Sequence, residues 1–198
     1  MTWVIVGLGN PGEEYINTRH NAGRSAVEYF AKWCDVGAWR VDEKAKARVT
    51  KGAVGKNLFA AVLPDTFMNK SGSALVKYVK SVKAAEKMIV VYDDLDLPIG
   101  KIKVSFDRGS GGHKGLESVT RAVKSKKFTR IRIGVSAATP GGKIKKPEGE
   151  KEVEKFILGY FRDAEKDELK KVFKKVSEAI ATTILDGHVI AMNKANQG

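Results

Sequence analysis

Four polar segments of this sequence follow apolar runs, and each carries side chains that can move protons or hold a substrate. In open α/β sheets, ligands bind beyond the carboxyl ends of the strands. The first three apolar runs could point the same way, so we expect the side chains that follow them to meet in one cleft. In chain order, the segments carry Asn10 and His20, then Asn69, then Asp93, Asp94 and Asp96, then His113 and Lys114.

A histidine that is oriented by a carboxylate can act as a general base for water. His20 has this potential, although a lone histidine is more often a hydrogen-bonded structural residue. Asn10 and Asn69 either shape turns or donate to a carbonyl and accept from an amine. The sequence has no serine nucleophile elbow, and Cys34 falls in a helical apolar stripe. The remaining chemistry is attack of an activated water on a carbonyl, and an ester suits it better than an amide because nothing assists a poor leaving group.

The acidic run from Asp93 to Asp96 has two other interpretations. It could be a solvated turn before Pro98, or it could bind Mg²⁺, because three carboxylates within four residues can hold a hard cation. No phosphate-cradling Walker loop accompanies it.

The stretch Gly7-Leu8-Gly9-Asn10-Pro11-Gly12 matches the dinucleotide fingerprint G-x-G-x-x-G. In that motif the helix starts among the glycines and points its N–H groups at the pyrophosphate. Here Pro11 removes a donor and pushes Asn10 away from helical angles. The first convincing helix starts near residue 22, so the intervening loop is about twice the usual length. We therefore reject a dinucleotide oxidoreductase and expect an active-site loop.

Positive charge is concentrated in one part of the chain. The 198 residues carry a net charge of +13, and residues 101–146 hold 13 basic and two acidic side chains. A basic surface can simply aid solubility, but this polarisation favours a nucleic-acid partner. Such a set would contact phosphates without reading sequence.

The remaining composition indicates one globular domain in a reducing compartment. No apolar run approaches the roughly 20 residues that span a membrane, and the chain enters a strand at residue 3, which leaves no room for a presequence. The single cysteine excludes an internal disulfide and a cysteine-based zinc site. We expect a cytoplasmic protein.

Alternating strands and helices predict an α/β fold with a mixed, largely parallel sheet. An antiparallel hairpin at 47–63 and a flexible basic loop at 136–150 complete the prediction. The expected strands are 3–8, 47–50, 57–63, 88–92, 101–106 and 129–135, and the expected helices are 22–34, 74–79 and 116–123, with C-terminal helices over 164–196.

Several motifs, in this order and spacing, resemble bacterial peptidyl-tRNA hydrolases over essentially the whole chain. They are "GLGNPGEEYINTRHNAG", "DTFMNKSG", "VVYDDLDLPIG" and "GSGGHKGLESV", followed by "FTRIRIGV", "FILGYF" and "GHVIAMNKAN". The resemblance implies a single domain over residues 1–198, built as a three-layer sandwich with helices on both faces of a twisted mixed sheet. It also implies a monomer that needs no cofactor or metal, binds tRNA rather than DNA, and hydrolyses the ester between peptide and tRNA, which recycles tRNA from aborted translation.

The resemblance also implies roles for individual residues. His20 is the general base, and Asp93 holds its imidazole. The peptide part and the water are held by Asn10 and Asn69, with Tyr15 and Met68 as cleft wall and Lys114 beside the substrate. The residues expected to face the tRNA are Lys103, Arg108, His113 and Arg132.

Two features depart from the family pattern. Lys114 stands where the family usually has asparagine, and the segment 136–156 is longer than usual. Both leave the base and its aspartate intact, so they put substrate handling in question more than the reaction. The alternative function is a non-catalytic RNA-binding protein, like the plastid splicing factors that use the same fold.

Overall fold

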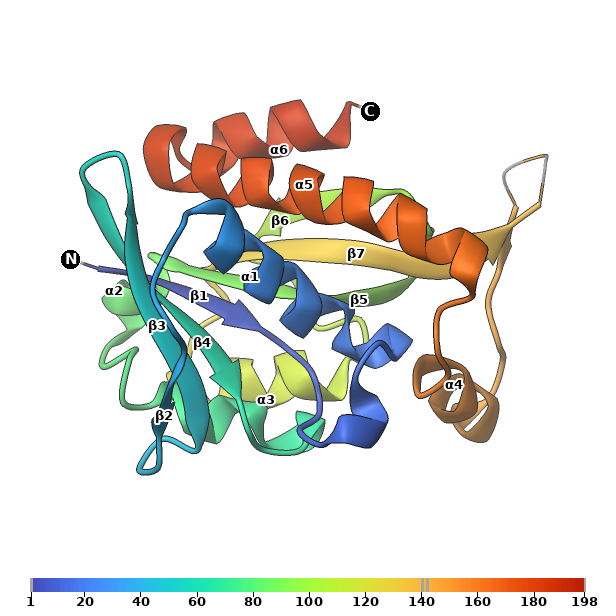
Figure 1. Cartoon of the computed structure of the whole chain (residues 1–198), viewed down its shortest axis with the longest axis horizontal. Helices are drawn as coiled ribbons and strands as arrows, with labels where there is room; N and C mark the ends of the chain where they lie inside the picture. Colours follow the sequence, from blue (N-terminus) through green and yellow to red (C-terminus); the bar gives the residue numbers. More distant parts are fainter. Residues whose placement is uncertain (1, 140, 142, 198) are drawn as a thin grey trace.

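The computed structural model describes residues 2–139, 141 and 143–197, and one eight-stranded mixed sheet runs through them (Figure 1). The strands lie in the order β2-β3-β4-β1-β5-β7-β6, and β8 pairs with the end of β7. Their bounds are β1 Trp3–Gly7, β2 Arg40–Asp42, β3 Ala47–Val54, β4 Asn57–Pro64, β5 Met88–Pro98, β6 Ile102–Phe106, β7 Thr129–Ala138 and β8 Ile144–Lys145.

The centre of the sheet is parallel, as the sequence predicted, and both of its edges are antiparallel, of which only the hairpin edge was predicted. β1 pairs in parallel with β4 and β5, and β5 pairs in parallel with β7. The hairpin of β3 and β4 supplies one antiparallel edge, and its tight turn uses Gly55 at a φ of 57°. Because β1, β4 and β5 run the same way, the segments that follow them emerge at one edge of the sheet.

Helices cover both faces of the sheet, which confirms the three-layer arrangement (Figure 1). α1, α5 and α6 pack on one face, and α2, α3 and a 3₁₀ segment, η3, pack on the other. α4 stands apart from both layers and contacts the 3₁₀ turn η2. The bounds are α1 Ala22–Trp33, α2 Val82–Ala85, α3 Lys114–Val123, α4 Glu150–Ile157, α5 Asp163–Asp186, α6 His188–Asn196, η1 Glu13–Tyr15, η2 Arg19–Asn21 and η3 Met68–Leu75.

The central strand β5 serves both cores. Val90 faces the core beneath α3, whereas Ile89 and Val91 face the core beneath α1 and α5. This is the side-chain alternation expected of a strand buried on both faces, and it explains why the stretch is continuously apolar.

The α-helix predicted over 74–79 is wrong. The chain instead forms the 3₁₀ segment η3 and then a turn. Two hydroxyls favour the tighter winding, because Ser71 donates to the carbonyl of Met68 and Ser73 donates to that of Lys70. A Cβ on Gly72 would lie 2.1 Å from the carbonyl oxygen of Ser118, so glycine lets η3 approach α3 closely.

Three further differences concern strand ends and connections. β5 continues to Pro98, so the acidic run is strand rather than turn, and β2 was not predicted. Part of the predicted 136–150 loop is ordered as the end of β7 and as β8, which pairs with Ala137 and Ala138, while residues 140 and 142 lie outside the described residues. Cys34, expected in the core, is half-buried at the end of α1. Among the helices that the structure describes, none combines the length and apolarity needed to cross a membrane.

Candidate active site

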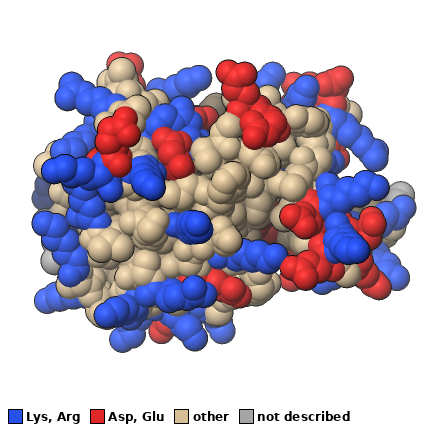
Figure 2. Space-filling model, turned by 90° about the horizontal axis from the view of Figure 1, so that it is seen from below, with Lys and Arg blue, Asp and Glu red and all other residues tan. Residues whose placement is uncertain are grey.

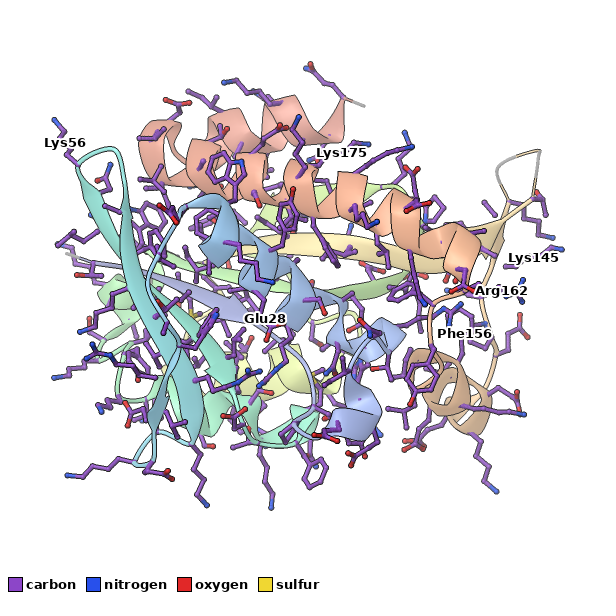
Figure 3. All side chains as sticks on the ribbon, viewed as in Figure 1. Glu28, Lys56, Lys145, Phe156, Arg162 and Lys175 are labelled. Atoms are coloured by element: carbon purple, nitrogen blue, oxygen red, sulfur yellow. The ribbon has the colours of Figure 1, made fainter. Side chains whose placement is uncertain are left out.

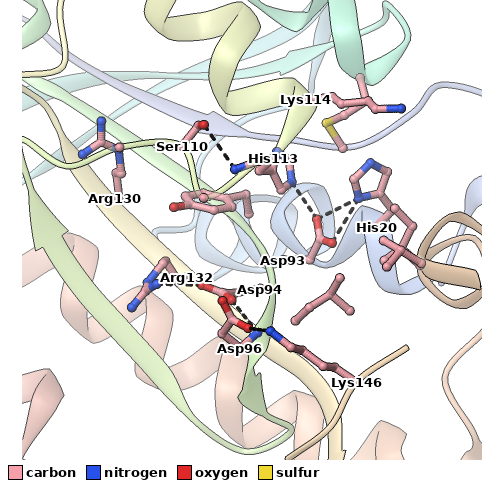
Figure 4. A pocket seen from close by; sticks show the side chains of 18 of the residues that line it. His20, Asp93, Asp94, Asp96, Ser110, His113, Lys114, Arg130, Arg132 and Lys146 are labelled. Carbon is pink, nitrogen blue, oxygen red and sulfur yellow. Dashed lines mark hydrogen bonds and ion pairs between the residues drawn. The ribbon is translucent and has the colours of Figure 1, made fainter. Parts of the chain in front are cut away.

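A cleft with a volume of about 1000 Å³ opens where β1, β4 and β5 end (Figure 4). This volume is at the upper end of the range for small-molecule pockets. The structure places every predicted site residue in its lining: Asn10, Tyr15, His20, Met68, Asn69, Asp93, Lys103, Arg108, His113, Lys114 and Arg132.

His20 and Asp93 form the buried pair at the centre of the cleft. Nδ1 of His20 lies 3.0 Å from both carboxylate oxygens of Asp93, and the two residues are 8% and 4% exposed. An ionised carboxylate only accepts hydrogen bonds, so Nδ1 carries the proton. The other ring nitrogen, Nε2, is therefore left with a lone pair that can accept a proton from water.

Close packing of α1 on β5 brings this pair together. A Cβ on Gly23 would lie 2.2 Å from the carbonyl oxygen of Val91, so only glycine allows the first turn of α1 to sit this close to the strand. His20 lies three residues before Gly23, and Asp93 lies two residues after Val91. The short distance between the helix and the strand therefore sets the short distance between the His20 imidazole and the Asp93 carboxylate.

Arg19 anchors the turn that carries His20 to the C-terminal part of the chain. Its guanidinium lies 2.9 Å from Glu165, donates to the carbonyl of Tyr160, and stacks 4.7 Å from the ring centre of Phe156 and 5.1 Å from that of Phe161. Figure 3 shows Phe156 between α4 and the turns η1 and η2. This contact joins "TRHN" to "FILGYF", two motifs that are far apart in the sequence.

A second histidine bonds to the same carboxylate. Nε2 of His113 lies 3.0 Å from Oδ1 of Asp93, and Nδ1 of His113 accepts from the backbone N–H of Leu116 at 3.2 Å. Because Nδ1 is an acceptor, the proton of a neutral His113 is on Nε2, which donates to Asp93. The sequence analysis placed His113 among the tRNA contacts, and the structure puts it beside His20 and Asp93.

Charges around the pair shift both pKa values. Burial works to lower the pKa of His20, but the charge and hydrogen bond of Asp93 raise it, and the result lies above the ordinary 6.5 even though Lys114 lowers it. Burial works to raise the pKa of Asp93, but His20 and His113 hold it well below its usual range. Asp93 is therefore ionised at neutral pH, and its charge favours the protonated form of His20.

Asn10 is fixed by two neighbouring segments. Its backbone N–H donates to Oδ1 of Asn21 at 2.8 Å, and its carbonyl accepts from Nδ2 of Asn21 at 2.9 Å. Its own Oδ1 accepts from the backbone N–H of Met68 at 2.8 Å. Nδ2 of Asn10 has no hydrogen-bond partner within residues 2–139, 141 and 143–197, so it remains available to a substrate in the cleft.

The wall beside Asn10 is formed by η3 and η1. Met68 is buried, Asn69 is exposed and Tyr15 is half-buried, and all three line the cleft. A Cβ on Gly115 would lie 2.3 Å from Sδ of Met68, so the thioether packs directly over the start of α3. A flexible, polarisable side chain suits a wall that must meet different substrate groups.

The carboxylates of the acidic run do not converge on one point. Asp94 lies 2.9 Å from Arg132, and Asp96 lies 2.6 Å from Lys146, while Asp93 faces the histidines. This arrangement favours ion pairs over the Mg²⁺ site considered from the sequence.

His20, Asp93 and His113 offer ligand atoms within 4.8 Å of one another, which raises the question of a metal ion. Coordination through Nε2 of His113 would move its proton to Nδ1, where it would meet the N–H of Leu116. The nitrogen and oxygen atoms that could bind a metal ion are therefore used in hydrogen bonds among His20, Asp93, His113 and Leu116.

A basic floor extends from the His20–Asp93 pair along β6 and β7, and it is formed by Lys103, Arg108, Arg130 and Arg132. Lys103 pairs across the strands with Arg132, and Ser105 pairs with Arg130. Arg130 is 1% exposed and stacks over Phe128, yet its Nε and Nη1 lack partners in the described part of the chain. Sequence reasoning missed Arg130, although the alternation in "TRIRIG" places it on the same face as Arg132.

Acidic and basic side chains are mixed on the α4 side of the cleft. In Figure 2, blue side chains follow much of the outline with red ones among them along the upper part, and the lobe on the right, where α4 lies, contains both. Lys114 belongs to this mixed region, because its Nζ lies 2.8 Å from Oε1 of Glu150 at the start of α4.

Comparison with known proteins agrees with the motifs and the geometry. Residues 4–198 match the family model described as peptidyl-tRNA hydrolase. The peptidyl-tRNA hydrolase of Herpetosiphon aurantiacus is 38% identical over 98% of this chain and 90% of its own length, and that of Carboxydothermus hydrogenoformans is 36% identical over 99% of each. The crystal structure of peptidyl-tRNA hydrolase from Acinetobacter baumannii aligns with a TM-score of 0.85 at 30% identity, covering 98% of this chain and 94% of that one. The chain belongs to the peptidyl-tRNA hydrolase family.

Proposed function

We propose that this chain hydrolyses the ester between the peptide and the ribose of peptidyl-tRNA, using a water activated by His20. The observation that carries the proposal is the buried bond from Nδ1 of His20 to both oxygens of Asp93, which leaves Nε2 as the proton acceptor. Family membership supplies the substrate class.

The reaction follows from this arrangement. Nε2 of His20 takes a proton from water as the water oxygen attacks the ester carbonyl. Asp93 stabilises the imidazolium that forms. Collapse of the tetrahedral intermediate breaks the carbon–oxygen bond, and the imidazolium returns its proton to the ribose oxygen. The products are a peptide carboxylate and tRNA with a free 3′ end.

Two amides hold the acyl part of the substrate. Nδ2 of Asn10 has no hydrogen-bond partner within the described segments and can donate to a peptide carbonyl or to the developing oxyanion. Asn69 lines the same wall and positions the attacking water or the peptide. Met68 and Tyr15 provide apolar surface that accepts varied side chains.

The acceptor end of the tRNA lies over the basic floor. Lys103, Arg108 and Arg132 contact its phosphates, and His113 keeps the Asp93 carboxylate in place at the boundary with the acyl site. Arg130 lines the cleft beside Arg132 and places a buried positive charge beneath these contacts. Lys114 reaches the phosphate next to the scissile ester.

The test is release of free tRNA from an N-blocked aminoacyl-tRNA. Catalysis predicts multiple turnovers by the intact chain and a rate at least ~100-fold lower for His20→Asn, with similar tRNA binding by both. The RNA-binding alternative predicts binding without turnover, which the retained His20–Asp93 pair argues against.

The proposal includes a monomer acting in the cytoplasm, where peptidyl-tRNA is made, with no DNA partner. One chain supplies the whole lining of the cleft, so a second copy is not needed to complete it. Sedimentation under assay conditions should give the monomer mass of 21.6 kDa, and a dimer would contradict this part of the proposal.

A further inference from the structure

Lys114 occupies an electrostatically unfavourable position in the fold. It is the first residue of α3, where the helix dipole places partial positive charge and disfavours a cation. The same helix end lies in the cleft lining, where its free N–H groups favour an anion. A lysine added there makes the α3 end a strong attractor of negative charge beside the catalytic histidine.

In the free protein, the anion beside Lys114 is the carboxylate of Glu150. The Lys114 and Glu150 side chains are joined at 2.8 Å, although they are 65% and 80% exposed. The hydrogen bond and the opposite charges raise the pKa of Lys114 and lower that of Glu150, so both groups are ionised at neutral pH. An ion pair this exposed to water contributes little to stability and is readily exchanged.

The cations around the cleft fall into two groups. Among the described residues, Lys103 and Arg108 make no ion pair. Lys114 is paired with Glu150, Arg132 with Asp94 and Lys146 with Asp96. The carboxylate of Asp94 is largely buried, with 11% exposure, and is fixed in β5. Glu150, by contrast, sits at an exposed helix start, from which its side chain can turn to water.

We propose that Glu150 is an intramolecular competitor of the substrate: it occupies Lys114 in the free enzyme and releases it to a phosphate of the tRNA acceptor end. The inference rests on the proposed contact between Lys114 and that phosphate, and adds that substrate must displace a carboxylate to make it. Glu150 therefore weakens binding of tRNA without touching the reacting atoms.

Steady-state kinetics of Glu150→Gln at low salt test the competition. Glutamine keeps the size of the side chain but removes its charge, so KM should fall roughly two- to fivefold, the range of an exposed ion pair, with kcat nearly constant. Glu152→Gln is the matched control, because Glu152 is an exposed acid on the same helix outside the cleft lining. It should leave KM within about 1.5-fold, below that range.

A double-mutant cycle with Lys114→Asn decides the origin of the effect. Competition for Lys114 predicts that Lys114→Asn raises KM and that adding Glu150→Gln to it changes nothing more. Titration of deacylated tRNA should give the same pattern in Kd, which keeps the test independent of chemistry.

Three results would overturn the inference in distinguishable ways. If Glu150→Gln lowers KM by the same factor in the intact chain and in the Lys114→Asn variant, the acid acts by general charge and not through Lys114. If Lys114→Asn raises KM but Glu150→Gln has no effect, the phosphate contact stands and the competition is wrong. If Lys114→Asn changes neither KM nor its salt dependence, the contact on which the inference rests is itself wrong.

Discussion

His113 donates through Nε2 to Oδ1 of Asp93 at 3.0 Å, and the same oxygen lies 3.0 Å from Nδ1 of His20. The Asp93 carboxylate thus accepts hydrogen bonds from two imidazoles, through Nδ1 of His20 and through Nε2 of His113. His113 cannot serve as the base, because its Nδ1 is bonded to Leu116 and its Nε2 proton points at Asp93. We therefore expect any effect of His113 on the rate to pass through the Asp93 carboxylate.

We expect His113→Ala to move the acid limb of the pH–rate profile upward. His20 must be neutral to accept a proton, so the rate falls as pH drops through its pKa. The hydrogen bond from His113 partly neutralises the negative charge of Asp93. When His113 is removed, the Asp93 carboxylate should stabilise the protonated form of His20 more strongly and raise the pKa of His20 further. The measurement is kcat/KM against pH, with thermal melting as a control for the lost bond to Leu116. A downward shift would contradict the shared-carboxylate account.

Asp93→Asn is expected to shift the acid limb in the opposite direction. Asp93 raises the pKa of His20 above 6.5, against the effect of burial, so its neutral analogue should let that pKa fall. Activity should also drop, because an amide cannot stabilise the imidazolium, but by less than on loss of His20. The measurement is again kcat/KM against pH. An acid limb at an unchanged pH would mean that a group other than Asp93 determines the pKa of the base.

Chelation should leave the reaction intact. The backbone N–H of Leu116 donates to Nδ1 of His113, so His113 is already hydrogen-bonded through both ring nitrogens. Asp94 is paired with Arg132, and Asp96 is paired with Lys146. Turnover with EDTA, on a substrate whose tRNA remains folded, should match the untreated rate. Strong inhibition that Mg²⁺ reverses would identify a metal site among the acids.

Charge reversal on the basic floor should weaken all tRNAs alike. Lys103→Glu, Arg108→Glu or Arg132→Glu removes a phosphate contact, so the slope of log Kd against log salt should fall by about 0.7 to 0.9 per contact. Titrations of several tRNAs across a salt series measure it, with exposed Lys56→Glu on the β3–β4 turn as the remote control (Figure 3). Weakening limited to one tRNA would indicate base readout.

The alternation of strands and helices predicted the mixed sheet and a cleft at its strand ends, whereas the resemblance of the motifs to a family implied the three layers and the residue roles. The apolar run in β5 predicted a central strand, and the polar segments after β1, β4 and β5 meet because those strands are parallel. The 3₁₀ winding of η3 was missed because it depends on which carbonyls the hydroxyls of Ser71 and Ser73 bond, and the apolar spacing of the stretch does not reveal this. The bonds of His113 to Asp93 and of Lys114 to Glu150 could not be predicted, since each joins segments whose relative position is set only by tertiary packing.

The central claim is that Nε2 of His20 activates the water, and single-turnover hydrolysis of N-blocked aminoacyl-tRNA by His20→Ala tests it most directly. With enzyme in excess, binding and product release do not limit the rate. Loss of a general base predicts a rate at least ~100-fold lower, with the Kd for deacylated tRNA nearly unchanged. Hydrolysis by His20→Ala at the rate of the intact chain would contradict the account.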